Sequence, residues 1–220
     1  MRNTRRISWI KAAQKDFRKF PSEAQDIVLD ALTIAAEGAK SSLAKPFKGA
    51  GSGVFEIALP FKGDAYRTIY AVQLGEAIWV IHAFQKKSKI GIKTPRQEVE
   101  LIKRRLTTTT GGTLMREEPL ELVHGSGNVY KDMGDGEADV RQAKALLAAE
   151  IIKVLDQEDL STRQAQEKTG VDHSEFVRIR GANLRRFTID RLILILGRLN
   201  HNVEISVTTH PKQRDFSSTP

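Results

Sequence analysis

The sequence predicts an α+β fold in which a domain of helices and antiparallel strands comes first and a mainly α-helical domain follows. Three observations predict it. The first half contains two helical patterns followed by three closely spaced runs of strand character. The second half has apolar residues at helical spacing through most of its length. Between them, "TTTTGGT" at 107–113 fits neither pattern and indicates a linker.

The first domain begins with a short strand candidate, "RISWI" at 6–10, which leads into two helical runs. The run "IKAAQKDFRKF" carries Phe17 and Phe20 among its apolar residues. In the next run, "PSEAQDIVLDALTIAAEG", Pro21 suits the start of a helix and Gly38 suits its end. We therefore expect two helices ahead of the sheet.

Three strand candidates follow, "VFEIALP" at 54–60, "AYRTIYAV" at 65–72 and "AIWVIHAF" at 77–84. The spacers "FKGD" and "QLGE" are short and turn-like, so the three strands should form an antiparallel meander. Pro95 then precedes a last helical run, "RQEVELIKRRL", which closes the domain.

The second domain contains a long amphipathic helix at 140–159, two shorter helical runs within 160–181 and another at 188–200. A strand-like run, "NVEISVTT", comes last. We take the first domain as 1–106, the linker as 107–119, the second domain as 120–210 and the tail as 211–220.

Composition and charge limit the possible functions. The chain has no cysteine, which removes disulfides and thiolate metal sites and favours a cytoplasmic protein. No run is apolar enough for a membrane span or a signal peptide. The net charge of +8 is unevenly shared: residues 1–110 hold 20 Lys and Arg against 10 Asp and Glu, and residues 111–220 hold 15 against 17. Such asymmetry favours a polyanion-binding first domain.

A lysine-rich stretch, "HAFQKKSKIGIKTP", directly follows the last strand candidate. Cleavage of RNA by its own 2′-hydroxyl needs a base, cations at the phosphate and an acid, and clustered lysines can serve because neighbouring charges depress their pKa. The alternatives are a solvated lysine surface and a histidine that belongs to the core. No metal or cofactor pattern is present. Catalytic candidates are Lys86, Lys87, Arg67 and His82, and RNA-binding candidates are Lys45, Lys48, Lys89 and Lys93.

The blocks "GVFEI", "YRTIYAV" and "HAFQKKSKIGIKTP" together resemble the phage-derived Gp49-like branch of the RelE/HigB toxin superfamily, over nearly all of 1–106. This resemblance implies two N-terminal helices on an antiparallel sheet and metal-independent cleavage of mRNA on the ribosome. It places Lys86 at the scissile phosphate and Lys45 and Lys48 in a second basic cluster. Glu56 departs from the pattern, because RelE itself often has arginine there.

The run "LSTRQAQEKTGVDHSEFVRIRG" has the layout of a helix-turn-helix, with Ser161 as an N-cap, a turn at Gly170 and Asp172 as the second cap. The start of the second helix would then face DNA bases, and nearby arginines would contact phosphates. A plain helical hairpin is the alternative. The DNA-binding candidates are His173, Ser174, Glu175, Arg178, Arg180 and Arg185.

With its surroundings, over about 120–207, this run resembles the Xre-family, HigA-like antitoxins that accompany such toxins. The resemblance implies operator binding, autorepression and a homodimer formed through this half. Two positions differ from the motif: Gln166 stands where alanine is usual at the helix–helix contact, and Thr169 where leucine is common.

The leading hypothesis is a toxin–antitoxin pair in one chain, in which a ribosome-dependent mRNA endoribonuclease is neutralised by its own DNA-binding antitoxin domain. The toxin–antitoxin contact would be intramolecular or intermolecular, and the acidic segment 116–139 would cover Lys86 and Lys87 or else block ribosome entry by bulk. One alternative is a non-catalytic helix-turn-helix regulator whose basic first module binds nucleic acid or a partner. Another is a degenerate fusion with neither activity.

Overall fold

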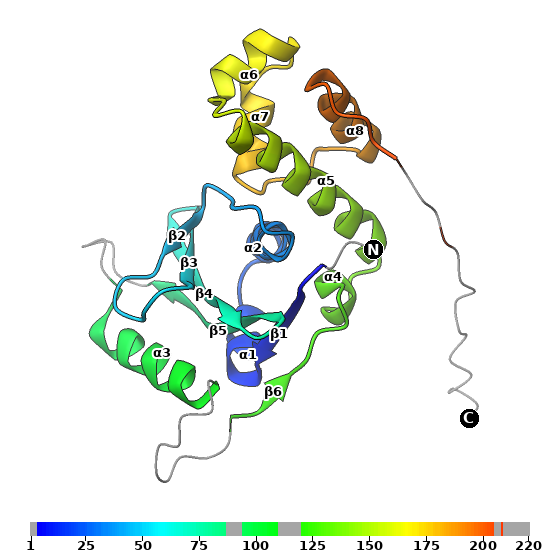
Figure 1. Cartoon of the computed structure of the whole chain (residues 1–220). Coiled ribbons are helices and arrows are strands. Elements are labelled where there is room, and N and C mark those ends of the chain that lie inside the picture. Colours follow the sequence, from blue (N-terminus) through cyan, green and yellow to red (C-terminus); the bar gives the residue numbers. More distant parts are fainter. Residues whose placement is uncertain (1–3, 87–93, 110–119, 205–207, 209–220) are drawn as a thin grey trace, which may run out of the picture.

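The computed structural model describes residues 4–86, 94–109, 120–204 and 208. It consists of a six-stranded sheet with helices on both faces and a group of helices stacked beyond one of those faces (Figure 1). We call 4–109 the first domain and 120–204 the second domain.

The three predicted strands form the antiparallel meander that the sequence indicates. They are β3 (Val54–Phe61), β4 (Asp64–Leu74) and β5 (Ala77–Lys86). Lys62 and Gly63, between β3 and β4, both have positive φ, 49° and 88°, as two-residue hairpins prefer because this turn matches the strand twist. A short strand that the sequence did not predict, β2 (Ala44–Pro46), pairs with β3 at the edge.

The sheet is mixed, so the prediction of a purely antiparallel sheet is wrong. Strand β1 (Arg6–Ile10) runs parallel to β5 and antiparallel to β6 (Leu122–Val123), giving the order β2-β3-β4-β5-β1-β6. The parallel pairing is possible because a long crossover separates β1 from β5. The second domain thus supplies the last strand of the sheet.

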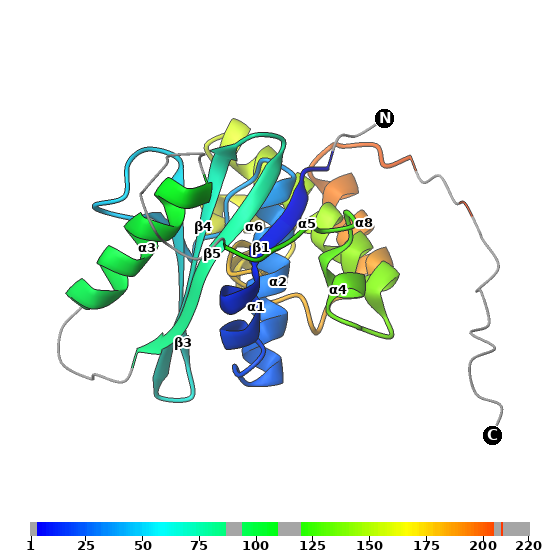
Figure 2. The ribbon, with the colours of Figure 1, turned by 90° about the horizontal axis from the view of Figure 1, so that it is seen from below.

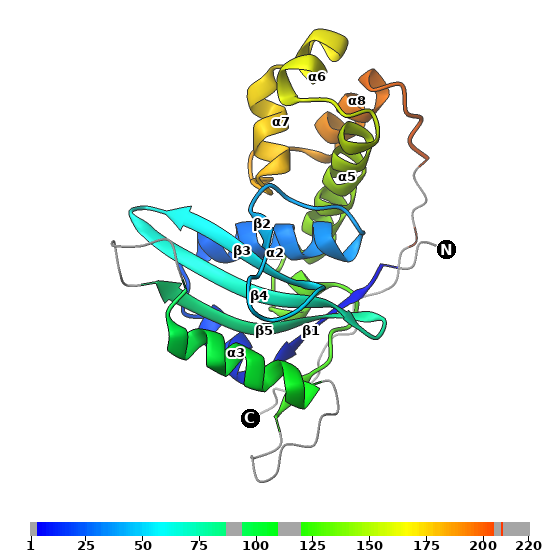
Figure 3. The ribbon, with the colours of Figure 1, turned by 60° about the vertical axis from the view of Figure 1, so that its left-hand side comes forward.

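Helices cover both faces of the sheet (Figure 3). Helix α1 (Lys11–Phe17) continues directly from β1 and packs Phe17 against Trp9 with ring centroids 5.0 Å apart. Helix α2 (Ser22–Ala36) lies on one face, begins after Pro21 as predicted and buries ten of its residues. Helix α3 (Arg96–Thr109) lies on the opposite face and continues three residues beyond its predicted end, into the predicted linker.

The second domain is helical as predicted. Helices α5 (Ala138–Gln157), α6 (Thr162–Thr169), α7 (His173–Arg180) and α8 (Ile189–Arg198) match the expected runs. The short helix α4 (Val129–Asp132) was not predicted. Val203 and Glu204 are not in a strand, and the rest of the strand-like run and the tail lie largely outside the described residues.

The two domains share one apolar core. A single buried cluster extends from Trp9 and Leu32 of the first domain through Tyr130 to Ala145 and Ile152 of α5. Figure 2 shows α4 and α5 beside α2. Among the described helices, none is both long and apolar enough to cross a membrane.

Candidate functional site

Strand register places the predicted basic residues on the sheet face that α3 covers. Lys45 of β2 pairs with Glu56 of β3, Glu56 pairs with Ile69 of β4, and Ile69 pairs with His82 of β5. Cross-strand partners point to the same side of a sheet. One row of side chains therefore runs from Lys45 to His82 across four strands.

Arg67 and Lys86 join this row on the same face. Side chains alternate along a strand, so Arg67 shares the side of Ile69, and Lys86 shares the side of His82. Arg67 and Lys86 each expose only 9% of their surface, and His82 exposes 4%. We call Lys45, Glu56, Arg67, His82 and Lys86 the basic face.

Glu56 forms an ion pair with Arg67, and both side chains are largely buried. The hydroxyl of Thr94, just before α3, also reaches Glu56, at 3.4 Å. A carboxylate thus stands against the guanidinium at Glu56, the position that the sequence comparison with RelE marks as a departure. The pair is shielded from water, so its charges interact more strongly than a surface pair would.

His82 lies between two α3 residues. Its Nδ1 lies 2.8 Å from Nη1 of Arg105, and its Nε2 lies 2.5 Å from Oε2 of Glu98. Burial lowers the pKa of His82, with Glu98 opposing and Arg105 assisting that shift, so the ring is neutral near pH 7. A neutral ring then accepts from Arg105 at Nδ1 and donates to Glu98 from Nε2. Both ring nitrogens are engaged, which favours a positioning role for His82.

The remaining predicted residues of this site have other settings. Lys48 is exposed in the loop after β2. Lys87, Lys89 and Lys93 lie outside the described residues, so their predicted roles stay predictions. Within the described part of the chain, no cluster of His, Asp and Glu is suited to hold a metal ion.

The basic face combines groups for phosphate binding and proton transfer. Arg67 and Lys86 supply cations on this face, and Glu56 supplies a carboxylate that pairs with Arg67. Sequence reasoning noted Glu56 only as a departure and missed Glu98 and Arg105. The alternation of side chains in "VFEIALP" puts Glu56 on the side of the sheet away from Phe55, a signal that could have indicated its role.

The helix-turn-helix has the predicted caps. Ser161 and Gln164 form a complete capping box at α6, Gly170 ends that helix with φ 68°, and Asp172 accepts from the backbone of Ser174 at 2.8 Å to start α7. A hydrogen bond explains why glutamine can stand at position 166: its Oε1 accepts from the backbone N–H of His173 at 2.9 Å. It therefore joins α6 to α7 by a hydrogen bond where alanine would join them by packing.

Helix α7 presents a surface suited to contact DNA. Phe176 and Ile179 face the core, whereas His173, Val177 and Arg178 are exposed. Val177 exposes 52% of its surface and places an apolar side chain beside the exposed His173 and Arg178. Arg185 and Arg186, in the loop after α7, are also exposed.

Glu175 and Arg180, two of the residues predicted to bind DNA, are paired with side chains of the second domain. Glu175 accepts two hydrogen bonds from Arg191 of α8, and these bonds lower its pKa. Arg180 pairs with Asp156 at the end of α5, at 2.7 Å. Their predicted contact with DNA stays a prediction, as does that of Ser174, which is half-buried at the start of α7.

The contact between the domains contains a buried polar junction. The hydroxyl of Tyr130 donates to Oδ1 of Asp30 at 2.6 Å. The Arg141 guanidinium stacks over the Tyr130 ring at 4.5 Å and pairs with Asp26 at 2.8 Å, Asp30 at 3.7 Å and Asp135. Burial raises the pKa of Asp30 to about 7, against the opposing influence of Tyr130 and Arg141.

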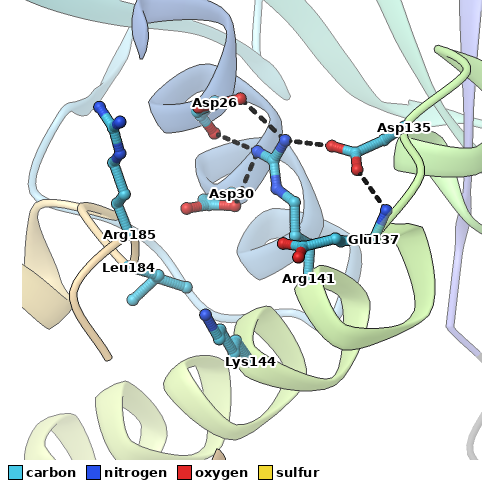
Figure 4. Close-up of a pocket in the computed structure, with 8 residues that line it drawn as sticks. All are labelled: Asp26, Asp30, Asp135, Glu137, Arg141, Lys144, Leu184 and Arg185. Carbon is cyan, nitrogen blue, oxygen red and sulfur yellow. Dashed lines mark hydrogen bonds and ion pairs between the residues drawn. The ribbon is translucent and has the colours of Figure 1, made fainter. Parts of the chain in front are cut away.

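A cavity of about 300 Å³ opens beside this junction (Figure 4). Acidic side chains from α2 and from the segment before α5 surround Arg141, and Lys144 and Arg185 line the opposite side. The cavity is thus bounded by both domains.

The acidic segment 116–139, where described, follows the β1 edge and then reaches α2. Glu121 pairs with Lys11, and Asp135 pairs with Arg141. Strand β6 lies beside Trp9 and Ile10, which neighbour the first half of β5, whereas Lys86 ends that strand. The described part of this segment, residues 120–139, therefore lies along the β1 edge and away from the end of β5 that carries Lys86.

These features define a two-domain fusion of a basic α+β domain and a helix-turn-helix unit. Residues 15–107 match the family model described as phage-derived protein Gp49-like, and residues 129–208 match the model described as helix-turn-helix domain. These matches indicate a Gp49-like domain followed by a helix-turn-helix domain, the order that the sequence predicts. No curated protein and no solved structure matches it significantly.

Proposed function

We propose that this chain is a toxin–antitoxin pair in one polypeptide, in which the first domain is a metal-independent, ribosome-dependent mRNA endoribonuclease. The single observation that carries the proposal is the basic face. A Gp49-like domain brings Lys45, Arg67 and Lys86 to one side of its sheet, together with the carboxylate of Glu56. RNA cleavage needs this combination of cations and a proton acceptor.

In the proposed reaction, Glu56 takes the proton of a ribose 2′-hydroxyl and the 2′-oxygen attacks the adjacent phosphorus. Arg67 stabilises the charge that develops on the phosphate oxygens. The bond from phosphorus to the 5′-oxygen breaks, and the Lys86 ammonium protonates that oxygen. The products are a 2′,3′-cyclic phosphate and a free 5′-hydroxyl. His82, Glu98 and Arg105 hold α3 against the sheet and position the face.

The second domain would restrain this activity in two ways. It is anchored on β1 through β6 and on α2 through the junction, so its bulk accompanies the first domain to the ribosome. It is also joined to α3 by a short stretch of chain, because only residues 110–119 lie between the end of α3 and residue 120, just before β6. Arg67 and Lys86 are nearly buried on the sheet face that α3 covers, so the proposed reaction requires this face to open to RNA.

The helix-turn-helix supports DNA binding by the second domain. We infer that α7 enters the major groove with His173, Ser174 and Val177, while Arg178 and Arg185 contact phosphates. Repression of the chain's own promoter and a homodimer formed through this domain complete the proposal. The proposed location is the cytoplasm, where ribosomes and DNA are both accessible in bacteria.

The alternative is a non-catalytic regulator, and the pairing of Arg67 with Glu56 favours it, because that pair leaves less net positive charge at the face. Growth assays separate the two. Residues 1–109 alone and the full chain are expressed separately in bacteria. We expect growth arrest and cut mRNA only with residues 1–109, and neither when this fragment carries Lys86→Ala.

If residues 1–109 are folded and mRNA stays intact, the endoribonuclease proposal is wrong. Circular dichroism of the purified fragment shows whether it is folded. Expression of residues 1–109 with 110–220 supplied separately provides the matched control, because the second fragment should restore growth.

A further inference from the structure

The first domain lies close to the DNA-facing side of the helix-turn-helix. A second cavity, also of about 300 Å³, is bounded by Glu23 and Phe61 of the first domain and by Arg178, Arg185 and Arg186 of the second. Three arginines suited to contact phosphate therefore share a cleft with Phe61, the last residue of β3 before the turn into β4. We call it the composite cleft.

Glu23 links cations from the two domains. Its Oε2 lies 3.4 Å from Nζ of Lys62, and its Oε1 lies 3.3 Å from Nη1 of Arg185. All three side chains are exposed, so these ion pairs contribute little to stability. The two oxygens of the Glu23 carboxylate thus pair with one ammonium and one guanidinium. A DNA phosphate also has two free oxygens and can pair with the same two cations.

Lys62 is held in place by the fold. It is the first residue of the β3–β4 turn, where its positive φ fixes the direction of its side chain, and its ammonium lies 5.0 Å from the centre of the Phe61 ring. The backbone of the first domain is also fixed against α7, because the N–H of Ser42 donates to the carbonyl of Arg180 at 2.7 Å. The distance from the turn to the recognition helix is therefore set by structure.

We propose that duplex DNA bound by α7 is also contacted by the first domain, with Lys62 on a phosphate next to the one held by Arg185. In the free chain the carboxylate of Glu23 occupies the place between these two cations that DNA phosphates take in the complex. The first domain thus extends the DNA-binding surface, and Glu23 weakens it by competition. This inference rests on the proposed DNA binding by the second domain.

The charge at the cleft supports duplex DNA as the ligand. Arg178, Arg185 and Arg186 line the cleft, and Lys62 is joined to it by its ion pair with Glu23. Asp26 and Asp30 also line it, but Asp26 pairs with Arg141 and burial raises the pKa of Asp30, so Glu23 is the carboxylate that pairs with two of these cations. Phosphate contacts supply most of the sequence-independent affinity of DNA-binding proteins, and each contact adds about 0.9 to the slope of log affinity against log salt. Loss of one contact is therefore measurable without a known operator.

The test uses the full chain and a labelled random-sequence duplex of about 30 base pairs, with affinity followed by fluorescence anisotropy between about 50 and 200 mM salt. We expect Lys62→Ala to weaken binding and to lower the salt slope by about 1. Lys62→Asn should do the same and keeps the turn, because asparagine tolerates positive φ. Glu23→Gln should tighten binding. The matched control is Lys103→Ala, an exposed lysine on α3, on the other side of the sheet.

The outcomes are decisive. If both Lys62 variants keep the slope of the Lys103 variant, or bind more tightly, the composite cleft does not hold DNA and the inference is overturned. Weaker binding by Glu23→Gln overturns the competing role of that carboxylate. Arg178→Ala separates this result from the proposed function: if neither it nor any other variant changes binding, or if no chain binds the duplex, DNA binding by α7 is itself wrong.

Discussion

Tyr130 of the second domain and Asp30 of the first form a hydrogen bond of 2.6 Å although 100 positions separate them in the sequence. Both side chains are buried, and Arg141 closes the group from the α5 side. A buried carboxyl is costly unless its hydrogen bonds are made, so the group is satisfied only when the domains are packed together. This relationship makes the junction a specific contact as well as a hydrophobic one.

Tyr130→Phe should therefore destabilise the chain. The substitution keeps the ring under Arg141 but removes the donor to Asp30, and loss of a partner from a buried polar group costs about 1–3 kcal/mol. For a chain of this size, each kcal/mol lowers Tm by about 2–4 °C. Thermal unfolding followed by circular dichroism measures the change. Tyr70→Phe is the control, since the buried Tyr70 ring stacks on Phe55 within the first domain. An equal decrease in Tm for the two variants would contradict a specific stabilising role of the Tyr130–Asp30 hydrogen bond.

Asp30 should make stability depend on pH in the opposite direction from an ordinary aspartate. Burial raises its pKa from 3.8 to about 7 in the folded chain, so the folded state binds a proton that the unfolded state has lost. The stabilisation this group provides is complete below pH 3.8 and is lost as the pH rises towards 7. The charged neighbours facing it are Asp26 on α2 and Arg141 on α5, with the phenol of Tyr130 on α4.

Asp30→Asn tests this dependence, because its amide oxygen still accepts from Tyr130 and does not titrate. We expect the free energy of unfolding of the parent chain to fall relative to the variant between pH 5 and 7, by up to about 1.4 kcal/mol per pH unit. Denaturant unfolding at several pH values gives both curves. A constant difference across this range would show that Asp30 titrates normally.

Gly125→Ala should loosen the attachment of the second domain at the sheet edge. A Cβ at this position would overlap the carbonyl oxygen of Ile7, and the Gly125 N–H donates to Oγ of Ser8 at 3.2 Å. The chain approaches β1 too closely for a side chain, so overpacking should cost about 1–3 kcal/mol. Gly136→Ala is the matched control, with nothing within 4 Å of its added Cβ. Tm should fall for the first and stay nearly unchanged for the second; the reverse order would contradict the close approach.

His82 should titrate below its ordinary pKa of 6.5 because burial disfavours its charged form. Glu98→Gln should lower that pKa further, since the carboxylate supports the imidazolium by hydrogen bonding and charge. Histidine proton shifts in NMR, with His82→Asn used to assign the signal, give both values. A His82 pKa that rises in the Glu98 variant would show that the His82 ring and the Glu98 carboxylate are not in contact.

Local patterns predicted the parts of the fold that local interactions form. The short spacers around Lys62 and Gly75 indicated the meander, and the caps at Ser161 and Asp172 indicated α6 and α7. Each of these features joins residues close in the sequence, where turn chemistry and capping decide the conformation.

The parts that escaped prediction depend on distant pairings. Strand β6 has only two residues and exists because β1 offers it an edge, and α4 is four residues long. From the sequence alone, Asp30 resembles a solvent-facing residue of an amphipathic helix. Its burial depends on Tyr130 and Arg141, which the second domain supplies. The lysines indicated a basic face, but they did not show that α3 covers it or that Glu56 pairs with Arg67.

Glu56→Gln should separate binding from chemistry at the basic face. In residues 1–109 expressed alone, this variant keeps the shape of the side chain beside Arg67 but removes the proposed proton acceptor. Loss of a general base lowers kcat by about 100-fold or more. RNA affinity should stay the same or increase, because one negative charge leaves the face. Lys86→Ala should weaken both binding and cleavage, and Glu76→Gln, in the exposed turn after β4, should change neither. Cleavage of ribosome-bound mRNA and binding of the same RNA, measured in parallel, give the comparison; a Glu56 variant that cuts as fast as the parent domain would assign the base to another residue.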